Sequence, residues 1–436
     1  MFYTSKEGGM ARTVAGLPEG SRLSDFITLG VLAGTFPAHK IHEVLRETGR
    51  ESERQRRLPA HVMVYYVIAL ALYMEVSYGE VLRCLVEGLQ WLGQPVKHLR
   101  QTSRVGISKA RTRLGFEPMQ RLYDELVHPI ATERTRGAFY HSAAQDRSWR
   151  LVSLDGSTLD IPDEEANAAA FGRPPSSKGR SAFPKLRFVS LAECGTHVLF
   201  ASSEGPYHEG EIELASKIVP KLRPGMLCMA DRYFFGYPLW RKATTTGSDL
   251  LWRVKNIIVL PCLDTFADGS YLSAIYPSTK ERHHKRNGIA VRVIEYTLES
   301  PDAPREHPRI YRLITTILDP DAAPARDLAA LYHERWEIES AFDELKTHLR
   351  GPRVVLRSKT PDLVRQEFYG LLLAHYAVRA LMHQAALSAD IDPDNVSFVH
   401  SVRVVRRKIQ TARGLSEAGP GDLASPFSPS TNGPSA

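Results

Sequence analysis

The chain has 436 residues, of which 43% are hydrophobic and 24% are charged, and its formal net charge is +7. This length allows two or three domains with a large core, and the composition is that of a soluble globular protein rather than a disordered or fibrous one. The longest apolar run, 62 to 74, is too short to span a bilayer, so we expect a core helix there and no membrane contact. The four cysteines show no CxxC pair and no zinc-ligand spacing with histidine, which favours a reducing, cytoplasmic location.

The first 140 residues predict a disordered end followed by a helical region. Residues 1–22 are rich in glycine and polar side chains, whereas the apolar spacing from 23 to 140 is helical. Between 97 and 137, nine Lys or Arg residues stand against four acids, and Lys109, Arg111 and Arg113 lie together in ISKARTRLG. This segment fits either a helical DNA-binding unit whose basic side faces phosphates or the solvated face of a helical bundle.

After residue 149 the apolar pattern changes from helical to alternating. It predicts strands at 151–159, 186–192, 197–202, 227–230 and 250–254, with helices at 209–222 and 237–246. Three successive strands followed by alternating helix and strand indicate an α/β fold, a mixed sheet with helices on its faces. Residues 256–308 are β-like and rich in turns, and the Asp-Gly and Asn-Gly pairs at 268–269 and 287–288 are hairpin signals.

The C-terminal part combines two long helices with a basic segment. A strand at 310–317 leads into a helix at 331–349, and a second amphipathic helix is expected at 363–387. Residues 391–436 contain a basic run and then a tail rich in Gly, Pro and Ser, which we expect to be disordered.

Four polar residues of the helix at 331–349 share one face. Tyr332, Arg335, Glu339 and Lys346 fall within about 60° of one another at about 100° per residue. A hydroxyl, a guanidinium, a carboxylate and an ammonium in one column suit a helix that binds a metal ion and phosphate. A solvated polar face is the alternative, and residues elsewhere in the chain have to decide between them.

Two aspartates upstream favour the metal-binding interpretation. Asp155 lies within LVSLDGSTLD and Asp231 follows the apolar residues MLCMA. A carboxylate beside buried strand residues is costly unless it is exposed at a sheet edge or binds a cation. Carboxylates that converge bind hard ions such as Mg²⁺ or Mn²⁺, and a pair of such ions about 4 Å apart can promote phosphodiester chemistry. Arg335 and Lys346 would then neutralise phosphate charge.

Asp155, Asp231 and Glu339, together with the Y-x2-R-x3-E-x6-K spacing, resemble the DDE transposases of the bacterial insertion sequence 4 family. The resemblance covers about residues 25–385 and includes DGS at 155–157, DRYF at 231–234 and ISKARTRLG at 107–115. It implies a ribonuclease-H-like catalytic domain at 141–255 and 309–390, interrupted by a β-rich insertion at 256–308. The helical region at 23–140 would be the DNA-binding domain.

The resemblance also implies roles for individual residues. Asp155, Asp231 and Glu339 would be the catalytic metal ligands, and Tyr332, Arg335 and Lys346 would contact phosphate beside the cleaved end. Tyr311 is the candidate for stacking on a flipped base. Further DNA contacts are expected from basic residues of the loop at 176–187 and of the N-terminal helix: Lys178, Arg180, Lys185, Arg187, Lys109, Arg111 and Arg113.

The expected function is therefore cut-and-paste DNA transposition with two Mg²⁺ ions, for which Mn²⁺ could substitute. The partners would be double-stranded DNA, as terminal inverted repeats and target, and a second copy of the chain on that DNA. The expected location is the bacterial cytoplasm, in association with the nucleoid. Two alternatives remain open: a ribonuclease-H-like nuclease without strand transfer, and a catalytically silent DNA-binding protein derived from a transposase.

Overall fold

The computed structural model describes residues 28–53, 58–74, 76–82, 85, 102–175, 183–297, 310–349 and 355–406. The ends that the sequence predicts to be disordered, 1–22 and the tail after 414, lie outside these residues. Within the described part of the chain, no helix is both long and apolar enough to cross a membrane.

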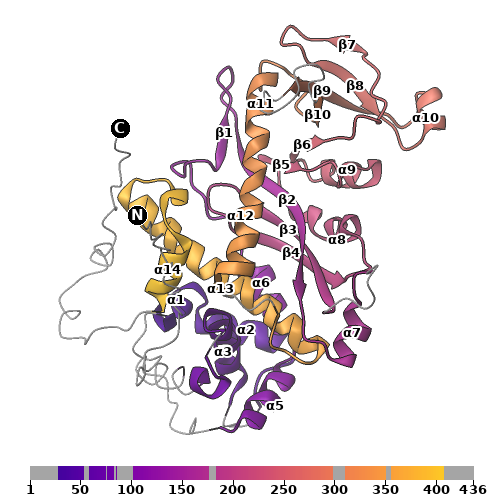
Figure 1. The fold of residues 1–436 in the computed structure, drawn as a ribbon. Helices are drawn as coiled ribbons and strands as arrows, with labels where there is room; N and C mark the ends of the chain where they lie inside the picture. The colour runs from indigo at the N-terminus through magenta and orange to yellow at the C-terminus, as the bar shows by residue number, and fades with distance from the viewer. Residues whose placement is uncertain are drawn as a thin grey trace, which may run out of the picture.

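The centre of the molecule is a ten-stranded mixed sheet (Figure 1). Its order is β4-β3-β2-β5-β6-β10-β9-β8-β7, and β1 pairs with β2 at one end. The strands are β1 Phe139–His141, β2 Ser148–Asp160, β3 Lys185–Glu193, β4 Leu199–Pro206, β5 Met226–Ala230, β6 Asp249–Arg253, β7 Asp264–Thr265, β8 Tyr271–Ile275, β9 Ile289–Thr297 and β10 Ile310–Thr315. Strands β2, β5 and β6 are parallel, whereas β3 and β4 join them antiparallel. This arrangement confirms the ribonuclease-H-like fold predicted from the sequence.

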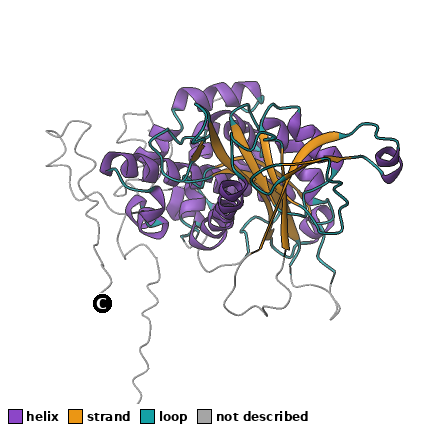
Figure 2. Cartoon of the chain, turned by 90° about the horizontal axis from the view of Figure 1, so that it is seen from above, coloured by secondary structure: helices purple, strands orange, loops and turns teal. Residues whose placement is uncertain are grey.

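Helices cover both faces of the sheet (Figure 2). They are α1 Thr28–Thr35, α2 Ala38–Glu47, α3 Ala60–Leu72, α5 Arg104–Leu114, α6 Glu117–Leu126, α7 Glu165–Phe171, α8 Glu211–Ile218, α9 Tyr237–Thr244, α10 Thr279–His283, α11 Ala325–Leu331, α12 Glu337–Asp343, α13 Pro361–Ala389 and α14 Phe398–Val405. Alternate residues of β2 enter two different cores, because side chains alternate across a strand: Val152 and Leu154 join one core and Leu151 joins the other.

The N-terminal helices pack on the central sheet through α13. Helix α3, which contains the apolar run seen in the sequence, is buried almost completely, as expected for a core helix. Gly370 of α13 permits this contact, since a Cβ there would lie 2.9 Å from the Val67 side chain and 3.0 Å from its carbonyl oxygen. The two parts are also joined at β4, where the Tyr123 hydroxyl donates to Leu199 O at 2.6 Å. The helical region thus shares one core with the sheet.

The β-rich insertion continues the central sheet. Strands β7, β8 and β9 add to β10, which itself pairs with β6. The Asp268-Gly269 signal is confirmed, since it lies in the hairpin between β7 and β8. The Asn287-Gly288 signal does not form a tight hairpin, because the connection between β8 and β9 contains α10. Asn287 there adopts a positive φ of 55° and lies two residues before the start of β9.

Candidate catalytic site

Asp155 and Asp231 lie side by side at the centre of the sheet. Leu154 of β2 pairs in parallel register with Ala230 of β5, and each aspartate is the next residue in its chain segment. Backbone N–H groups hold both carboxylates: Gly156 N donates to Asp155 Oδ1 at 2.8 Å, and Tyr233 N donates to Asp231 Oδ1 at 2.7 Å. The two aspartates, 76 residues apart in the sequence (231 − 155), are therefore neighbours in the fold.

The expected helix at 331–349 is continuous but not uniform. Helix α11 leads into a 3-10 turn, Tyr332–Trp336, then into α12, and finally into a π-helical segment, Glu344–Leu349. Its four polar residues nevertheless face the ends of β2 and β5, as their spacing predicts. The Tyr332 hydroxyl donates to Ala230 O at 3.1 Å, and Lys346 Nζ donates to Ser157 Oγ at 2.9 Å.

Arg335 joins the segment to the carboxylates. Its Nη1 lies 3.2 Å from Asp155 Oδ2, and its Nη2 lies 3.5 Å from Glu339 Oε1. Asp231 is close enough to act on the same guanidinium. The side chain of Arg335 is 9% exposed, whereas that of Glu339 is 45% exposed. One buried guanidinium thus stands among three carboxylates that come from three separate parts of the chain.

The charge balance of this cluster suits a cation. The pKa of Asp155 is raised to about 6, chiefly by burial, with smaller upward effects from the carboxylates of Asp231 and Glu339 and downward effects from the Gly156 N–H and Arg335. Three carboxylates and one guanidinium leave an excess of negative charge at a partly buried position. Divalent ions with oxygen ligands relieve such an excess, so the residues present fit a hard metal ion.

A fourth acid, Glu211, lies beside the cluster and was not predicted from the sequence. It begins α8, and a Cβ on Gly156 would come within 2.8 Å of its Cδ. Burial raises the pKa of Glu211, Asp231 raises it further, and Arg187 lowers it. The glycine of the DGS motif leaves room for the Glu211 side chain in this position, and a larger residue would require that side chain to move. No spacing in the sequence connects Glu211 to the triad, because the contact depends on how α8 returns to the sheet.

Tyr332 and Tyr311 occupy less accessible positions than their expected DNA roles require. Tyr332 is buried, and a phosphate contact would require its hydroxyl to leave Ala230 O. Tyr311 of β10 stacks on Tyr296 with ring centroids 5.5 Å apart, and the Arg253 guanidinium lies 4.5 Å from its ring. A flipped base would have to displace or extend this stack.

The expected basic DNA contacts fall into three groups. Lys109 and Arg113 of α5 are exposed, so both are available to DNA. Arg111 is buried: its Nε donates to Gln366 Oε1 at 2.8 Å and its Nη2 to Ser358 Oγ at 3.0 Å. We therefore withdraw Arg111 from the DNA contacts, because its guanidinium joins α5 to α13.

The loop preceding and entering β3 supplies the remaining basic candidates. Lys178 and Arg180 lie outside the described residues. Lys185 pairs with Asp160 at 2.7 Å and remains partly exposed. Arg187 donates to Glu209 O at 3.1 Å, and its guanidinium lies 4.5 Å from the Tyr207 ring. Both described residues thus border the end of β2, and their contact with DNA stays a prediction.

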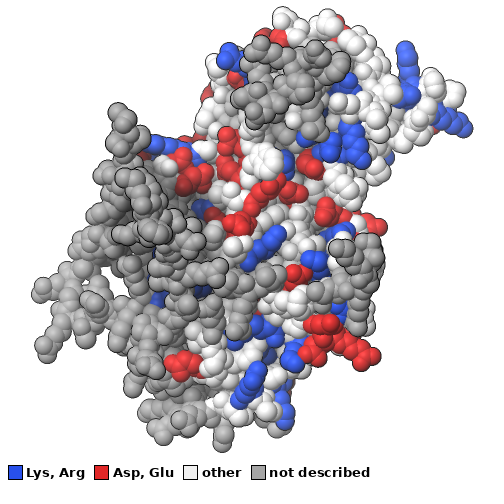
Figure 3. All heavy atoms as spheres, viewed as in Figure 1, with Lys and Arg blue, Asp and Glu red and all other residues white. Residues whose placement is uncertain are grey.

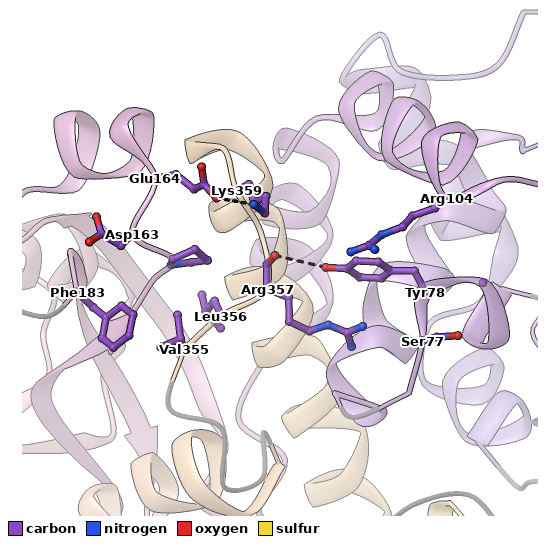
Figure 4. Close-up of a pocket in the computed structure, with 12 residues that line it drawn as sticks. Ser77, Tyr78, Arg104, Asp163, Glu164, Phe183, Val355, Leu356, Arg357 and Lys359 are labelled. Atoms are coloured by element: carbon purple, nitrogen blue, oxygen red, sulfur yellow. Dashed lines mark hydrogen bonds and ion pairs between the residues drawn. The ribbon is translucent and has the colours of Figure 1, made fainter. Parts of the chain in front are cut away.

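The charged surface places the acidic cluster between basic regions. Figure 3 shows acidic side chains gathered over the middle of the face on which β2, β5 and α12 lie, with Lys and Arg side chains above and below them. Farther along, a groove of about 930 Å³ separates the N-terminal helices from the end of β2. Arg104 and Arg357 flank the Tyr78 ring there, with guanidinium-to-centroid distances of 5.7 and 4.3 Å (Figure 4).

Comparison with known proteins agrees with this geometry. Residues 26–124 match the insertion element 4 transposase N-terminal family, and residues 149–377 match the transposase DDE domain family. The chain is 26% identical over 385 residues to the Escherichia coli K12 transposase InsG for insertion sequence element IS4, covering 86% of this chain and 82% of InsG. It is 23% identical over 231 residues to InsZ of the same strain, a transposase by name, covering 52% of this chain and 72% of InsZ. The second family match spans more than half of the chain, and the chain therefore belongs to the DDE transposases of the insertion sequence 4 family.

Proposed function

We propose that this transposase binds the terminal inverted repeats of its own insertion sequence, cleaves their ends and joins the freed 3′-hydroxyls to target DNA. The observation that carries the proposal is the convergence of Asp155, Asp231 and Glu339 around Arg335 in a sheet of the DDE family. Membership of the family makes DNA the substrate class and makes the enzyme metal-dependent. The roles of the individual residues are inferred from the geometry of the cluster.

Asp155, Asp231 and Glu339 would hold the metal, with Mg²⁺ as the proposed ion, two ions as the proposed number, and Mn²⁺ as a substitute. When bound, these ions would lower the pKa of an attacking water or 3′-hydroxyl and stabilise the leaving oxygen. The partial burial of Asp155 limits access of bulk water to the cluster. Asp155 and Asp231 are positioned by neighbouring strands and by backbone N–H groups, and Glu339 lies on α12 beside Arg335, so little reorganisation is needed before the reaction.

Arg335 and Lys346 would neutralise phosphate near the cleaved bond. Arg335 presents two nitrogens toward the carboxylates, and a guanidinium can grip a phosphate with the same fork. Lys346 extends from the π-helical segment toward Ser157, two residues beyond Asp155. These positions support contact with the phosphate whose ester bond is broken. Tyr332, Tyr311, Lys109, Arg113, Lys178, Arg180, Lys185 and Arg187 remain proposed DNA contacts, and exposed Arg104 in the groove of Figure 4 joins them.

Two copies of the chain are proposed to act together, because excision requires both ends of the element. Action on chromosomal DNA would place the protein with the bacterial nucleoid.

The decisive experiment supplies the full-length chain with Mg²⁺ and a DNA segment bounded by the inverted repeats that flank its gene. Release of the segment and its insertion into a plasmid is the expected result. Cleavage without a joined product would instead support a nuclease that lacks strand transfer. Binding without cleavage, in Mg²⁺ and also in Mn²⁺, would support a silent DNA-binding protein.

A further inference from the structure

A second cluster of ligating side chains lies around His197, in the turn between β3 and β4. His197 Nε2 is 3.3 Å from Asp394 Oδ1 and 3.7 Å from Glu337 Oε2. One ligand atom from each residue lies within 4.8 Å of the other two. Glu337 is the first residue of α12, and Asp394 belongs to the 3-10 turn Pro393–Asn395 that follows α13. We propose that His197, Glu337 and Asp394 hold a Zn²⁺ ion that fixes the start of the helix carrying Glu339.

The state of His197 points to a ligand at this position. Its side chain is only 8% exposed, and Nε2 is buried without a hydrogen bond among the described residues. Burying a polar nitrogen without a partner is unfavourable, and such atoms are rare in folded proteins. Nε2 faces the Glu337 and Asp394 carboxylates, so a cation between the three would satisfy the nitrogen and both oxygens together.

The separations between the ligand atoms match Zn²⁺ coordination. Zn²⁺ binds imidazole nitrogen and carboxylate oxygen at about 2.0–2.2 Å, which places neighbouring ligands of a tetrahedral ion roughly 3.4 Å apart. The two separations from Nε2, 3.3 and 3.7 Å, are close to this value. A mixed set of imidazole and carboxylates suits Zn²⁺ better than Mg²⁺, which prefers oxygen ligands and retains its waters.

The other ring nitrogen of His197 has the partner that metal-binding histidines commonly have. Nδ1 lies 3.2 Å from Glu344 Oε1 and also lies against Arg379 Nη2, which can only donate. The tautomer that leaves the Nε2 lone pair for the ion carries its proton on Nδ1 and donates it to Glu344. Glu344 is itself held by His375 Nε2 at 3.0 Å and by Arg379 Nε at 2.8 Å. The imidazole orientation is therefore fixed by a buried network and not by the ion alone.

The local charge balance is compatible with a cation despite Arg379. The Arg379 guanidinium lies against Nδ1, but it is paired with Glu344 through two of its nitrogens. Glu337 and Asp394 are the carboxyl groups that face Nε2, and burial raises the pKa of both, which opposes their ionisation in the absence of a cation. A divalent ion would favour the ionised form of both carboxyl groups and would offset the cost of burying their charge.

This cluster is separate from the catalytic carboxylates although it shares their helix. Glu337 and Glu339 are two residues apart, which places them about 200° apart around a helix. Glu339 approaches Arg335, whereas Glu337 accepts a hydrogen bond from Gly195 N and faces His197. A Zn²⁺ ion here would link α12 to the β3–β4 turn and to the segment after α13, and would stabilise the helix that positions Glu339.

The test measures Zn²⁺ binding to the full-length chain by titration calorimetry, in the absence of Mg²⁺. The measurements use the unmodified chain and a version with Asp155→Asn and Glu339→Gln, which removes two carboxylates of the catalytic cluster. Asp394→Asn is the informative variant, because the Asp394 side chain is 43% exposed and its replacement spares the buried network. Asp390→Asn is the matched control: it makes the same change of charge nearby, at a φ of 54° that asparagine tolerates.

We expect one Zn²⁺ per chain in the Asp155→Asn, Glu339→Gln version. Asp394→Asn should weaken this binding at least tenfold, His197→Gln should abolish it, and Asp390→Asn should leave it unchanged. Zn²⁺ should also raise the unfolding temperature of the Asp155→Asn, Glu339→Gln version, and the further change Asp394→Asn should remove that rise. Co²⁺ in place of Zn²⁺ should give the visible absorption of a four- or five-coordinate ion. The absence of Zn²⁺ binding, or binding that Asp394→Asn does not weaken, would overturn the proposal without bearing on the catalytic carboxylates.

Discussion

Arg335 Nη1 lies 3.2 Å from Asp155 Oδ2, although 180 residues separate the two in the chain. This contact connects the 3-10 turn before α12 to the end of the apolar part of β2. The Arg335 guanidinium also approaches Glu339, so it balances the charge of the catalytic carboxylates and holds the helix segment against the sheet. Its contact with the carboxylates and its proposed contact with phosphate can be separated by mutation.

Replacing Arg335 by alanine should weaken DNA binding and reduce cleavage. Each lost phosphate contact lowers the slope of log affinity against log salt by about 0.9 for duplex DNA, because fewer counterions are released on binding. Arg335→Lys keeps the charge but not the fork, so it should retain the slope and recover cleavage only in part. The measurement is the affinity for an inverted-repeat duplex across a salt series, with cleavage assayed in parallel. An unchanged slope in Arg335→Ala would limit Arg335 to holding the carboxylates.

Glu339→Gln should abolish cleavage and leave binding to the inverted repeats largely intact. The substitution removes one charge at a 45% exposed side chain, so the fold should tolerate it, while the proposed metal site loses a ligand. Cleavage and gel-shift assays on the same DNA would measure the two effects. Asp343→Asn is the control, since Asp343 is an exposed acid at the end of the same helix and pairs with His348. Cleavage by Glu339→Gln at the rate of the Asp343→Asn control would remove Glu339 from the triad.

Binding of Mg²⁺ to the catalytic carboxylates should depend on pH with a midpoint near 6. The pKa of Asp155 is raised by burial to about 6, so its carboxyl keeps its proton at pH 5, where an exposed aspartate is ionised. A metal ion must displace that proton, and its affinity should therefore fall about tenfold for each pH unit below 6 and level off above it. Mg²⁺ titrations at several pH values, without DNA, would show this. Asp155→Asn should lack the inflection, and an inflection near pH 4 in the unmodified chain would contradict the effect of burial.

The sheet and the neighbouring positions of Asp155 and Asp231 could be predicted from the sequence because they depend on short-range signals. The alternating apolar pattern around Asp155 and the run ending at Asp231 mark strands, and parallel pairing places both strand ends together. Tyr332 and Lys346 remain on one face although the segment contains a 3-10 turn and a π-helical turn. The 3-10 turn is wound more tightly than an α-helix and the π-helical turn less tightly, so their effects on side-chain direction oppose each other. Those irregular turns themselves have no signal in the sequence.

Contacts between distant segments could not be predicted in this way. Glu211 approaches Gly156 only because α8 returns to the sheet, and His197 meets Asp394 only because the chain after α13 passes the β3–β4 turn. The sequence likewise does not indicate which way a basic side chain on a helix faces until the packing partner of the helix is known. Arg111 illustrates the problem, because it lies between Lys109 and Arg113 in the sequence but points into the protein.

Arg111 and Arg113 should therefore behave in opposite ways when replaced by alanine. Arg111→Ala leaves Gln366 Oε1 and Ser358 Oγ without their donor in a buried position, and should cost about 3 kcal/mol of stability. Arg113 is exposed, so Arg113→Ala should leave stability within about 0.5 kcal/mol and reduce the salt slope of DNA binding by about 0.9. Thermal unfolding and binding across a salt series would measure both. Ser358 and Gln366 also form hydrogen bonds with other groups, so Arg111→Ala can lose less than this amount of stability. An unchanged stability would contradict the buried network. If Arg111→Ala instead reduced the salt slope of DNA binding and left stability unchanged, Arg111 would return to the proposed DNA contacts. Helix α5 would then have to rotate away from α13 on DNA.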